Sequence, residues 1–438
     1  MQFKIKNGKG LKGEITVPGD KSISHRAIML ASLASGKSKI SGFLEGEDCL
    51  ATIEVFQSMG VNISKSEGVF IVEGRGLKGL EDPTSLLDFR NSGTSVRLCS
   101  GVLAAQGFSS TLIGDSSLSL RPMKRITDPL RLMGANISSS EEGTLPIRIE
   151  PVNRLKSIKY SLPVASAQVK SCLLFAGLYS EGIIEIEEKV TTRDHTERMF
   201  EQFGIPIEAT RSKSAKLIKL NKVESINPMN IDICGDFSSA SFFILAALIT
   251  PNSELLIRNV GVNPTRIGFL HALRHMGANI ELINESDSFE PTADLMVKTS
   301  DLKGITINAN LVANMIDEMP VFFIAASLAE GVTKVKGAKE LRTKESDRLQ
   351  VMSEVLDSFG VQFRLEEDGI IIYGLGKNGT FKASKVNSYG DHRIAMSSSI
   401  GSLRAEGETT VLDCSNVNTS FPNFIEVCKE VGINIESL

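Results

Sequence analysis

Basic and small polar side chains gather where a helix is expected to begin. Lys21, Ser22 and Arg26 follow a Pro-Gly turn and lead into the apolar run 27–33. The first turn of a helix has free backbone N–H groups and a partial positive charge, so added cations favour an anion-binding site. The alternative is a surface turn with solvated basic residues, which are common near helix ends. The spacing of a P-loop is absent here.

Comparable polar residues precede later apolar segments, and most of the charged ones are basic. Arginine is suited to bidentate binding of carboxylates and phosphates. Taken singly, each arginine is better explained as a solvated or structural residue. Their repeated placement at equivalent helix starts favours one shared anion-binding cleft. The candidates from these segments are Asn91, Gly93, Arg121, Ser166, Ala167, Gln168, Arg193, Lys344, Arg348 and Arg393.

Two carboxylates lie among these cations and could transfer protons. Asp317 comes just before the apolar run 321–328, and Glu345 lies between Lys344 and Arg348. Asp317 is also explained as part of an ordinary helix N-cap. Glu345 is also explained by an i,i+3 salt bridge on a helix. In the catalytic interpretation both are acid–base groups held beside bound anions.

The elements that must position these residues recur six times along the chain. A small or polar turn followed by an apolar helix alternates with an amphipathic helix that ends in glycine and leads into a strand. Each pattern returns roughly every 70–80 residues, which indicates repetition of one supersecondary unit. We expect the first helix of each unit to be buried and the second to cover a sheet. The glycines are expected C′ caps in the left-handed conformation: Gly60, Gly134, Gly204, Gly277, Gly360 and Gly432.

Length and composition limit the function. The 438 residues are enough for two or three domains, and the net charge of −4 argues against broad nucleic-acid binding. The six cysteines are scattered without zinc spacing, which indicates free thiols in a reducing compartment. We find neither a signal peptide nor an apolar run long enough to span a bilayer, and therefore expect a cytoplasmic protein without membrane contact.

Nine stretches, in order along nearly the whole chain, resemble the EPSP synthase (3-phosphoshikimate 1-carboxyvinyltransferase) family. The set is highly specific, although no single stretch would be. The stretches are PGDKSISHR (18–26), RNSGTSVRL (90–98), DSSLSLRPM (115–123), SAQVKS (166–171), TTRDHTE (191–197), DFSSASFF (236–243), MIDEMP (315–320), LRTKESDRL (341–349) and YGDHRIAM (389–396).

The resemblance implies a two-domain inside-out α/β barrel with six βαβαββ repeats, three per domain. It places residues 1–20 and 235–438 in the first domain and residues 21–234 in the second. The implied reaction transfers the enolpyruvyl group of phosphoenolpyruvate to the 5-hydroxyl of shikimate 3-phosphate, in the shikimate pathway to chorismate and aromatic amino acids. The resemblance implies no metal or organic cofactor, and we expect a monomer.

The resemblance also assigns roles residue by residue. Asp317 would take the proton of the 5-hydroxyl, and Glu345 with Lys21 would transfer protons at the enolpyruvyl carbon. The implied phosphoenolpyruvate contacts are Lys21, Gly93, Arg121, Gln168, Arg348 and Arg393, with Asn91 as a further substrate-binding candidate. The implied shikimate 3-phosphate contacts are Ser22, Arg26, Ser166, Ala167, Gln168, Asp317 and Lys344, with Arg193 less strongly indicated.

Some residues depart from the family pattern. Thr419-Ser420 stands where some members carry a lysine before a Phe-Pro pair, and Ala167 replaces a serine. TRDHTE and KESDR resemble the branch that tolerates glyphosate, but that branch often has alanine where Gly93 stands, so the response to this inhibitor is left open. Two alternatives remain. One is the related UDP-N-acetylglucosamine enolpyruvyl transferase, whose loop cysteine is missing from 115–120. The other is a non-catalytic repeat scaffold that binds polyanions.

Overall fold

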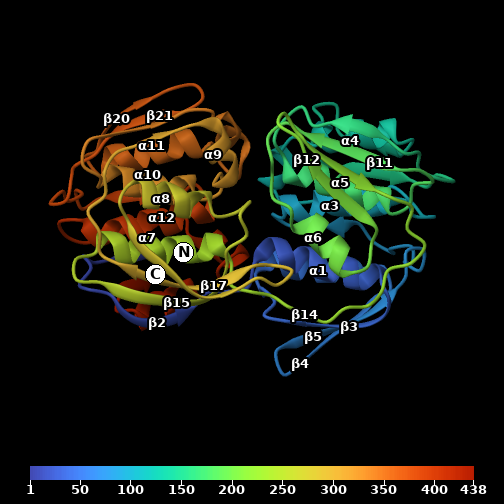
Figure 1. The fold of residues 1–438 in the computed structure, drawn as a ribbon, viewed down its shortest axis with the longest axis horizontal. Helices are drawn as coiled ribbons and strands as arrows, with labels where there is room; N and C mark the ends of the chain where they lie inside the picture. Colours follow the sequence, from blue (N-terminus) through green and yellow to red (C-terminus); the bar gives the residue numbers. More distant parts are fainter. The chain divides into compact units, whose positions relative to one another are not determined.

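The chain divides into two compact units in the computed structural model, which describes residues 1–438 (Figure 1). Unit 1 comprises Met1–Pro18 with Cys234–Leu438, and unit 2 comprises Gly19–Ile233. Relative to the boundaries expected from the sequence, Gly19 and Asp20 belong to unit 2, and Cys234 belongs to unit 1. No helix combines the length and the apolar character that crossing a membrane requires.

Unit 2 contains six α-helices and three four-stranded sheets. The helices are α1 (Lys21–Leu33), α2 (Glu47–Ser58), α3 (Gly93–Leu103), α4 (Lys124–Leu132), α5 (Ala167–Gly177) and α6 (His195–Gln202). The strands are β3 (Ser35–Ser41), β4 (Asn62–Ser66), β5 (Val69–Arg75), β6 (Leu87–Asp88), β7 (Ser110–Ile113), β8 (Asn136–Ser138), β9 (Ile147–Glu150), β10 (Lys159–Ser161), β11 (Ile184–Glu188), β12 (Ile207–Arg211), β13 (Lys216–Leu220) and β14 (Ile231–Asp232).

Unit 1 repeats the arrangement with three further four-stranded sheets and one additional helix, α9. The helices are α7 (Phe237–Ile249), α8 (Gly268–His275), α9 (Ala309–Asn314), α10 (Met319–Ser327), α11 (Arg348–Ser358), α12 (His392–Gly401) and α13 (Phe424–Glu430). The strands are β1 (Phe3–Ile5), β2 (Lys12–Thr16), β15 (Glu254–Gly261), β16 (Asn279–Ser286), β17 (Thr292–Lys298), β18 (Thr306–Ile307), β19 (Val332–Val335), β20 (Gln362–Leu365), β21 (Ile370–Tyr373), β22 (Lys385–Asn387), β23 (Thr409–Leu412) and β24 (Ile435–Ser437).

One sheet shows the topology of the repeat. In the order β6-β7-β9-β8, β6 runs parallel to β7, and β9 is antiparallel to both β7 and β8. Helix α3 connects the parallel pair and α4 leads to β8, so the unit reads βαβαββ. The sheets β10-β11-β13-β12 and β18-β19-β21-β20 repeat this pattern without interruption. The predicted repeat and fold class are confirmed.

The other three sheets each take one strand from a distant part of the chain. β14 pairs in parallel with β3, although about 190 residues separate them. β2 pairs in parallel with β15, and β1 lies between β23 and β24. The chain termini therefore complete sheets of unit 1, and the segment that leaves unit 2 completes a sheet there. These exchanges tie each unit into a closed set of three sheets.

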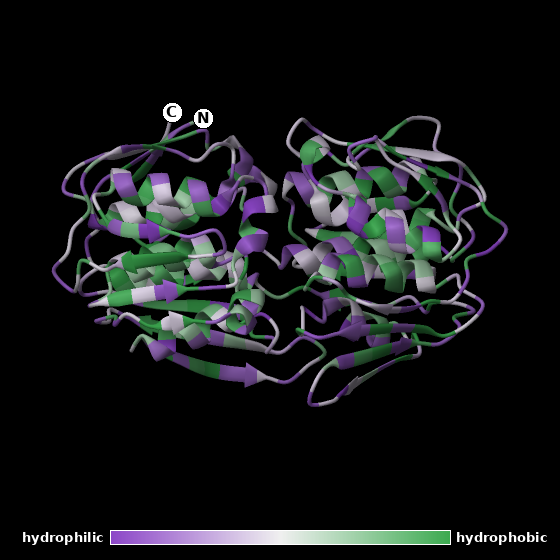
Figure 2. Ribbon diagram, turned by 90° about the horizontal axis from the view of Figure 1, so that it is seen from above, coloured by the Kyte–Doolittle hydropathy of each residue, from purple (hydrophilic) through white to green (hydrophobic).

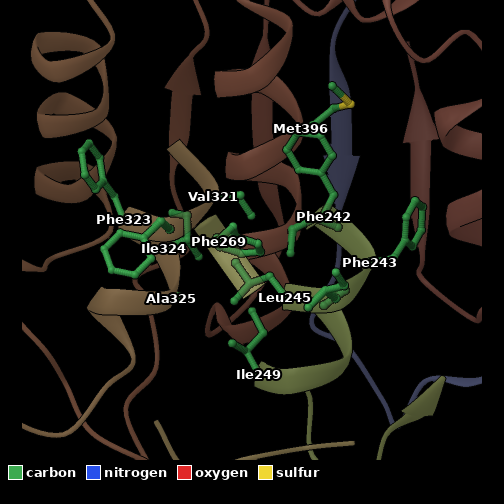
Figure 3. Close-up of a cluster of buried hydrophobic side chains, with 14 of the residues drawn as sticks. Phe242, Phe243, Leu245, Ile249, Phe269, Val321, Phe323, Ile324, Ala325 and Met396 are labelled. Atoms are coloured by element: carbon green, nitrogen blue, oxygen red, sulfur yellow. The ribbon is translucent and has the colours of Figure 1, made fainter. Parts of the chain in front are cut away.

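The first helix of each repeat is buried, as the sequence predicts. Every residue of α7 and α10 is buried, and side chains from these helices meet those of α8 and α12 in the core of unit 1 (Figure 3). Figure 2 shows hydrophobic residues gathered on the stacked helices inside each unit. In unit 2, a Cβ on Gly101 of α3 would lie 2.1 Å from the carbonyl oxygen of Cys172 on α5, so these helices pack at a distance that only glycine permits.

Glycine ends the second helix of each repeat. All six predicted C′ glycines have φ between 74° and 94°. This left-handed conformation is costly for a residue with a Cβ, which explains why the same residue type recurs at each helix end. All six cysteines are buried free thiols.

Candidate functional site

In unit 2, the first polar cluster lies at the start of α1. Asp20 caps the helix by accepting a 2.9 Å hydrogen bond from the backbone N–H of Ile23. Lys21 and Ser22 occupy the first turn and are half-buried. The Lys21 ammonium forms an ion pair with Asp48 in the first turn of α2. The Asp48 carboxylate therefore orients a cation that keeps 18% of its side-chain surface exposed.

Arg26 lies one turn further along α1, where it is buried and joins three helices. Its Nε donates to Thr196 Oγ1 over 2.7 Å, its Nη2 donates to Ser171 Oγ over 2.8 Å, and its Nη1 donates to the Ser22 carbonyl oxygen over 2.9 Å. Burial lowers its pKa to about 10, and the Asp20 and Glu197 carboxylates counteract part of that effect. Arg26 thus fixes α1 against α5 and α6, in addition to any contact with an anion.

Gly93 begins α3 and lies between two buried guanidinium groups. A Cβ at this position would lie 2.9 Å from Arg97 Nη1 and 3.1 Å from Arg121 Nη1. Arg97 Nη1 donates to Gln168 Oε1 over 2.7 Å, and Arg121 Nη2 donates to Asn91 Oδ1, also over 2.7 Å. The structure therefore brings Asn91, Gly93, Arg121 and Gln168 together, with Arg97 between them. The absence of a side chain on Gly93 leaves room for both guanidinium groups.

The remaining candidates of unit 2 lie on α5 and on the segment before α6. Ser166 caps α5 through a 3.4 Å hydrogen bond from the Val169 N–H, and Ala167 is the first helical residue. Gln168 also donates to Thr94 Oγ1 over 3.0 Å, which fixes its amide from a second side. Arg193 is half-buried in the segment between β11 and α6.

In unit 1, the candidates form one cluster around Asp317. Its Oδ1 lies 3.6 Å from Arg348 Nη1, and its Oδ2 lies 3.9 Å from Arg393 Nη2. Arg393 Nη1 also donates to the Asp317 backbone carbonyl over 3.0 Å. Arg348 Nη2 lies 2.5 Å from Glu345 Oε2, and its Nε lies 2.8 Å from Asp391 Oδ2. The carboxylates of Asp317 and Glu345 therefore share one guanidinium group.

Burial and charge shift the ionisation of two cations in this cluster. Burial by itself would lower the pKa of Arg348, but the carboxylates of Asp391 and Glu345 outweigh it and raise that pKa. Lys344 is half-buried, and burial lowers its pKa even though Asp317 favours the charged form. Arg348 is thus permanently charged, whereas Lys344 loses its proton at a lower pH than an exposed lysine does.

The structure corrects three sequence-based interpretations of this cluster. Asp317 does not cap a helix, because α10 begins at Met319 and its N-cap residue is Glu318. Glu345 does pair with Arg348 at i,i+3, but it lies before α11 rather than on it. The expected predominance of basic groups does not hold in unit 1, since buried guanidinium groups there require carboxylate partners. These include Glu318, which lies 3.9 Å from Arg393.

Sequence reasoning missed the partners of the candidate residues. Asp48 gave a weak signal as an acidic residue in the first turn of α2. Asp391 belongs to the YGDHRIAM stretch, but its contact with Arg348 across 43 positions has no local signal in the sequence. At the positions where some family members have a lysine, Thr419 donates to the Asn416 carbonyl and Ser420 is buried. No group of three or more His, Cys, Asp or Glu side chains is arranged to hold a metal ion.

Comparison with known proteins identifies related sequences along the whole chain. The family model described as EPSP synthase (3-phosphoshikimate 1-carboxyvinyltransferase) matches residues 5–428. A 3-phosphoshikimate 1-carboxyvinyltransferase of Methylococcus capsulatus is 50% identical over 431 residues, which cover 98% of this chain and 97% of that protein. One of the same name from Bacillus cereus is 47% identical over 426 residues, covering 97% of each chain.

Solved structures give the same result. An EPSP synthase from Acinetobacter baumannii has a TM-score of 0.87 and 46% identity, with 99% of each chain covered. The enolpyruvyl transferase NikO from Streptomyces tendae has a TM-score of 0.80, with 99% of this chain and 98% of that chain covered. At 15% identity, this second likeness concerns the fold alone.

Proposed function

We propose, from the premise that the chain belongs to the EPSP synthase family, that it transfers the enolpyruvyl group of phosphoenolpyruvate to the 5-hydroxyl of shikimate 3-phosphate. The products are 5-enolpyruvylshikimate 3-phosphate and inorganic phosphate, and the step belongs to the shikimate pathway. One observation carries the assignment of the catalytic group. Asp317 lies outside any helix, 17% of its side chain is exposed, and two guanidinium groups lie within 4 Å of its carboxylate.

Residues of unit 2 supply much of the anion recognition in this proposal. Lys21, Gly93, Arg121 and Gln168 contact phosphoenolpyruvate. Ser22, Arg26, Ser166, Ala167 and also Gln168 contact shikimate 3-phosphate, with Arg193 less strongly indicated. Each substrate carries a phosphate and a carboxylate, and charge-assisted hydrogen bonds to such groups are about twice as strong as neutral ones. Hydrogen bonds with Arg97 and Thr94 fix the orientation of the Gln168 amide. A fixed amide supports the assignment of Gln168 to substrate binding.

We assign the proton transfers and further substrate contacts to residues of unit 1. Arg348 and Arg393 bind phosphoenolpyruvate, and Lys344 binds shikimate 3-phosphate. The 5-hydroxyl oxygen bonds to C2 of phosphoenolpyruvate while Asp317 accepts the hydroxyl proton and C3 gains a proton. The resulting tetrahedral intermediate loses phosphate with its electron pair, and C3 gives up a proton to restore the double bond. Glu345 and Lys21 carry the protons at C3. Proton transfer by a positioned group contributes about 10²–10⁴-fold in rate.

A phosphate-release assay tests this proposal against both alternatives. We expect release from phosphoenolpyruvate that depends on shikimate 3-phosphate and is not supported by UDP-N-acetylglucosamine. Loop 115–120 contains no cysteine, which disfavours the second acceptor. A non-catalytic scaffold would bind both anions and release no phosphate. Release with UDP-N-acetylglucosamine alone, or none with either acceptor, would contradict the proposal.

We also propose that the chain acts as a cytoplasmic monomer. Six buried free cysteines and no disulfide suit a reducing compartment. Light scattering on the eluting protein should give a mass near 47.4 kDa. A mass of twice this value that persists on dilution would overturn the monomer.

A further inference from the structure

Three buried charged side chains of unit 2, Lys170, Glu188 and Glu197, form a network with the half-buried Lys216, and the proposed reaction uses none of the four. Lys170 Nζ lies 3.1 Å from Glu188 Oε1 and 2.8 Å from Glu197 Oε1. Lys216 Nζ lies 3.1 Å from the same Glu197 oxygen. The side chains of Lys170 and Glu188 have no exposed surface. A buried lysine in contact with two carboxylates requires an explanation, because apolar residues of similar volume often pack there at no loss of stability.

The opposite charges within the network favour the charged states of Lys170 and Glu197, although Asp194 opposes this at Glu197. Burial by itself would lower the pKa of Lys170, but Glu197 and Glu188 raise it. Burial would raise the pKa of Glu197, yet Lys170 and Lys216 lower it. Lys170 and Glu197 are therefore both charged at neutral pH.

The network connects the segments that carry the candidate shikimate 3-phosphate residues. Lys170 lies one turn into α5, which begins with Ser166 and Ala167. Glu188 is the last residue of β11, and its Oε1 accepts a hydrogen bond from the Thr192 hydroxyl. Glu197 lies in the first turn of α6. The segment between β11 and α6 contains Arg193, so its two ends are fixed to one ammonium group on α5.

We propose that Lys170 is a positioning residue for shikimate 3-phosphate, which rests on the proposed function. Through Glu188 and Glu197, its ammonium group holds the β11–α6 segment in the conformation that places Arg193 near Arg26, the other arginine assigned to this substrate. The contact to phosphoenolpyruvate through Gln168 does not depend on this network, because Arg97 and Thr94 hold that amide. The loss of Lys170 should therefore raise KM for shikimate 3-phosphate and leave KM for phosphoenolpyruvate nearly unchanged.

The test uses the double variant Lys170→Met/Glu188→Gln. Lys170→Met alone leaves Glu188 buried without a cation, which is expected to destabilise the fold. The double variant keeps Glu197 paired with Lys216, and the amide oxygen introduced at position 188 still accepts from Thr192. We expect KM for shikimate 3-phosphate to rise about tenfold, which corresponds to about 1.4 kcal/mol. We expect kcat and KM for phosphoenolpyruvate to change less than about twofold, and Lys170→Arg should retain most of the wild-type behaviour.

A cycle with Arg193→Met separates positioning from general loosening of the fold. If Lys170 acts through Arg193, then Lys170→Met/Glu188→Gln should not raise KM for shikimate 3-phosphate any further in a chain that already carries Arg193→Met. The matched control is Arg258→Met/Asp294→Asn, which removes an ion pair of 2.8 Å from a sheet of unit 1. That control should lower the melting temperature without a selective change in KM.

Two outcomes would overturn the proposal. An unchanged KM for shikimate 3-phosphate in a folded double variant overturns it, as does an equal increase in the Arg193→Met background. If the double variant melts below the assay temperature, Thr192→Val removes the hydroxyl contact to Glu188 alone and should still raise that KM. Failure of the proposed function is recognised separately, because the wild-type chain would then release no phosphate.

Discussion

Gly93→Ala tests how closely the guanidinium groups approach the start of α3. The new Cβ would lie 2.9 Å from Arg97 Nη1, closer than real Cβ contacts come, and 3.1 Å from Arg121 Nη1, tighter than most real contacts. The Arg97 guanidinium group must move and that of Arg121 must give way by a few tenths of an ångström, although hydrogen bonds of 2.7 Å tie them to Gln168 and Asn91 respectively. A hydrogen bond to a charged group contributes about 1.5–3 kcal/mol, so losing one such contact should raise KM for phosphoenolpyruvate about 10- to 100-fold.

The assay is phosphate release at saturating shikimate 3-phosphate with phosphoenolpyruvate varied. The matched control is Gly107→Ala, since a Cβ there has nothing within 4 Å, and it should leave both KM values unchanged. The Gly93 variant should remain folded, because only side-chain atoms at the far ends of Arg97 and Arg121 approach the new Cβ. A KM for phosphoenolpyruvate within about twofold of the wild-type value would refute the placement of Arg121 at this substrate.

Three further predictions concern proton transfer and pH. Asp317→Asn should lower kcat about 10²–10⁴-fold in the same assay, and near-normal turnover would refute the general-base role. Burial lowers the pKa of Lys344, so this side chain loses its charge at a lower pH than an exposed lysine does. KM for shikimate 3-phosphate should therefore begin to rise at that lower pH when the pH is increased. Lys344→Arg should remove this rise, and an unchanged alkaline limb would contradict the assignment. His25 has a pKa well below its ordinary 6.5, chiefly because of burial and also because of Lys21 and Arg26. The unfolded chain then binds more protons below pH 6.5, so the free energy of unfolding should fall there by up to about 1.4 kcal/mol per pH unit. Denaturant titrations should show a weaker fall for His25→Gln, and an equal fall would rule out His25 as its source.

The repeats were predictable because their signals are local. Each C′ glycine marks a helix end by its own backbone requirement, and each buried helix is recognised by a run of apolar and small residues that follows its polar first turn. The strand exchanges had no such signal. Nothing near β14 indicates that it pairs with β3, because strand partners are chosen by tertiary packing.

The candidate site was predictable in its residues and less so in its contacts. Motif residues such as Lys21 and Arg348 are visible in the sequence, but their partners Asp48 and Asp391 lie 27 and 43 positions away. The pairing of arginines with carboxylates in unit 1 could therefore be seen only in the structure. Lys170 illustrates the same limit, since a lysine in an apolar helix shows its function only when Glu188 and Glu197 are seen beside it.

Binding of shikimate 3-phosphate, measured by titration calorimetry, tests most directly the central claim that the candidate residues bind this substrate. Ser22→Ala changes unit 2 and Lys344→Met changes unit 1, and neither removes a group assigned to proton transfer. We predict that each variant binds about five- to 100-fold more weakly than the wild-type chain, as expected for one lost neutral or charged hydrogen bond. Wild-type affinity in either variant would contradict the assignment of that residue to shikimate 3-phosphate.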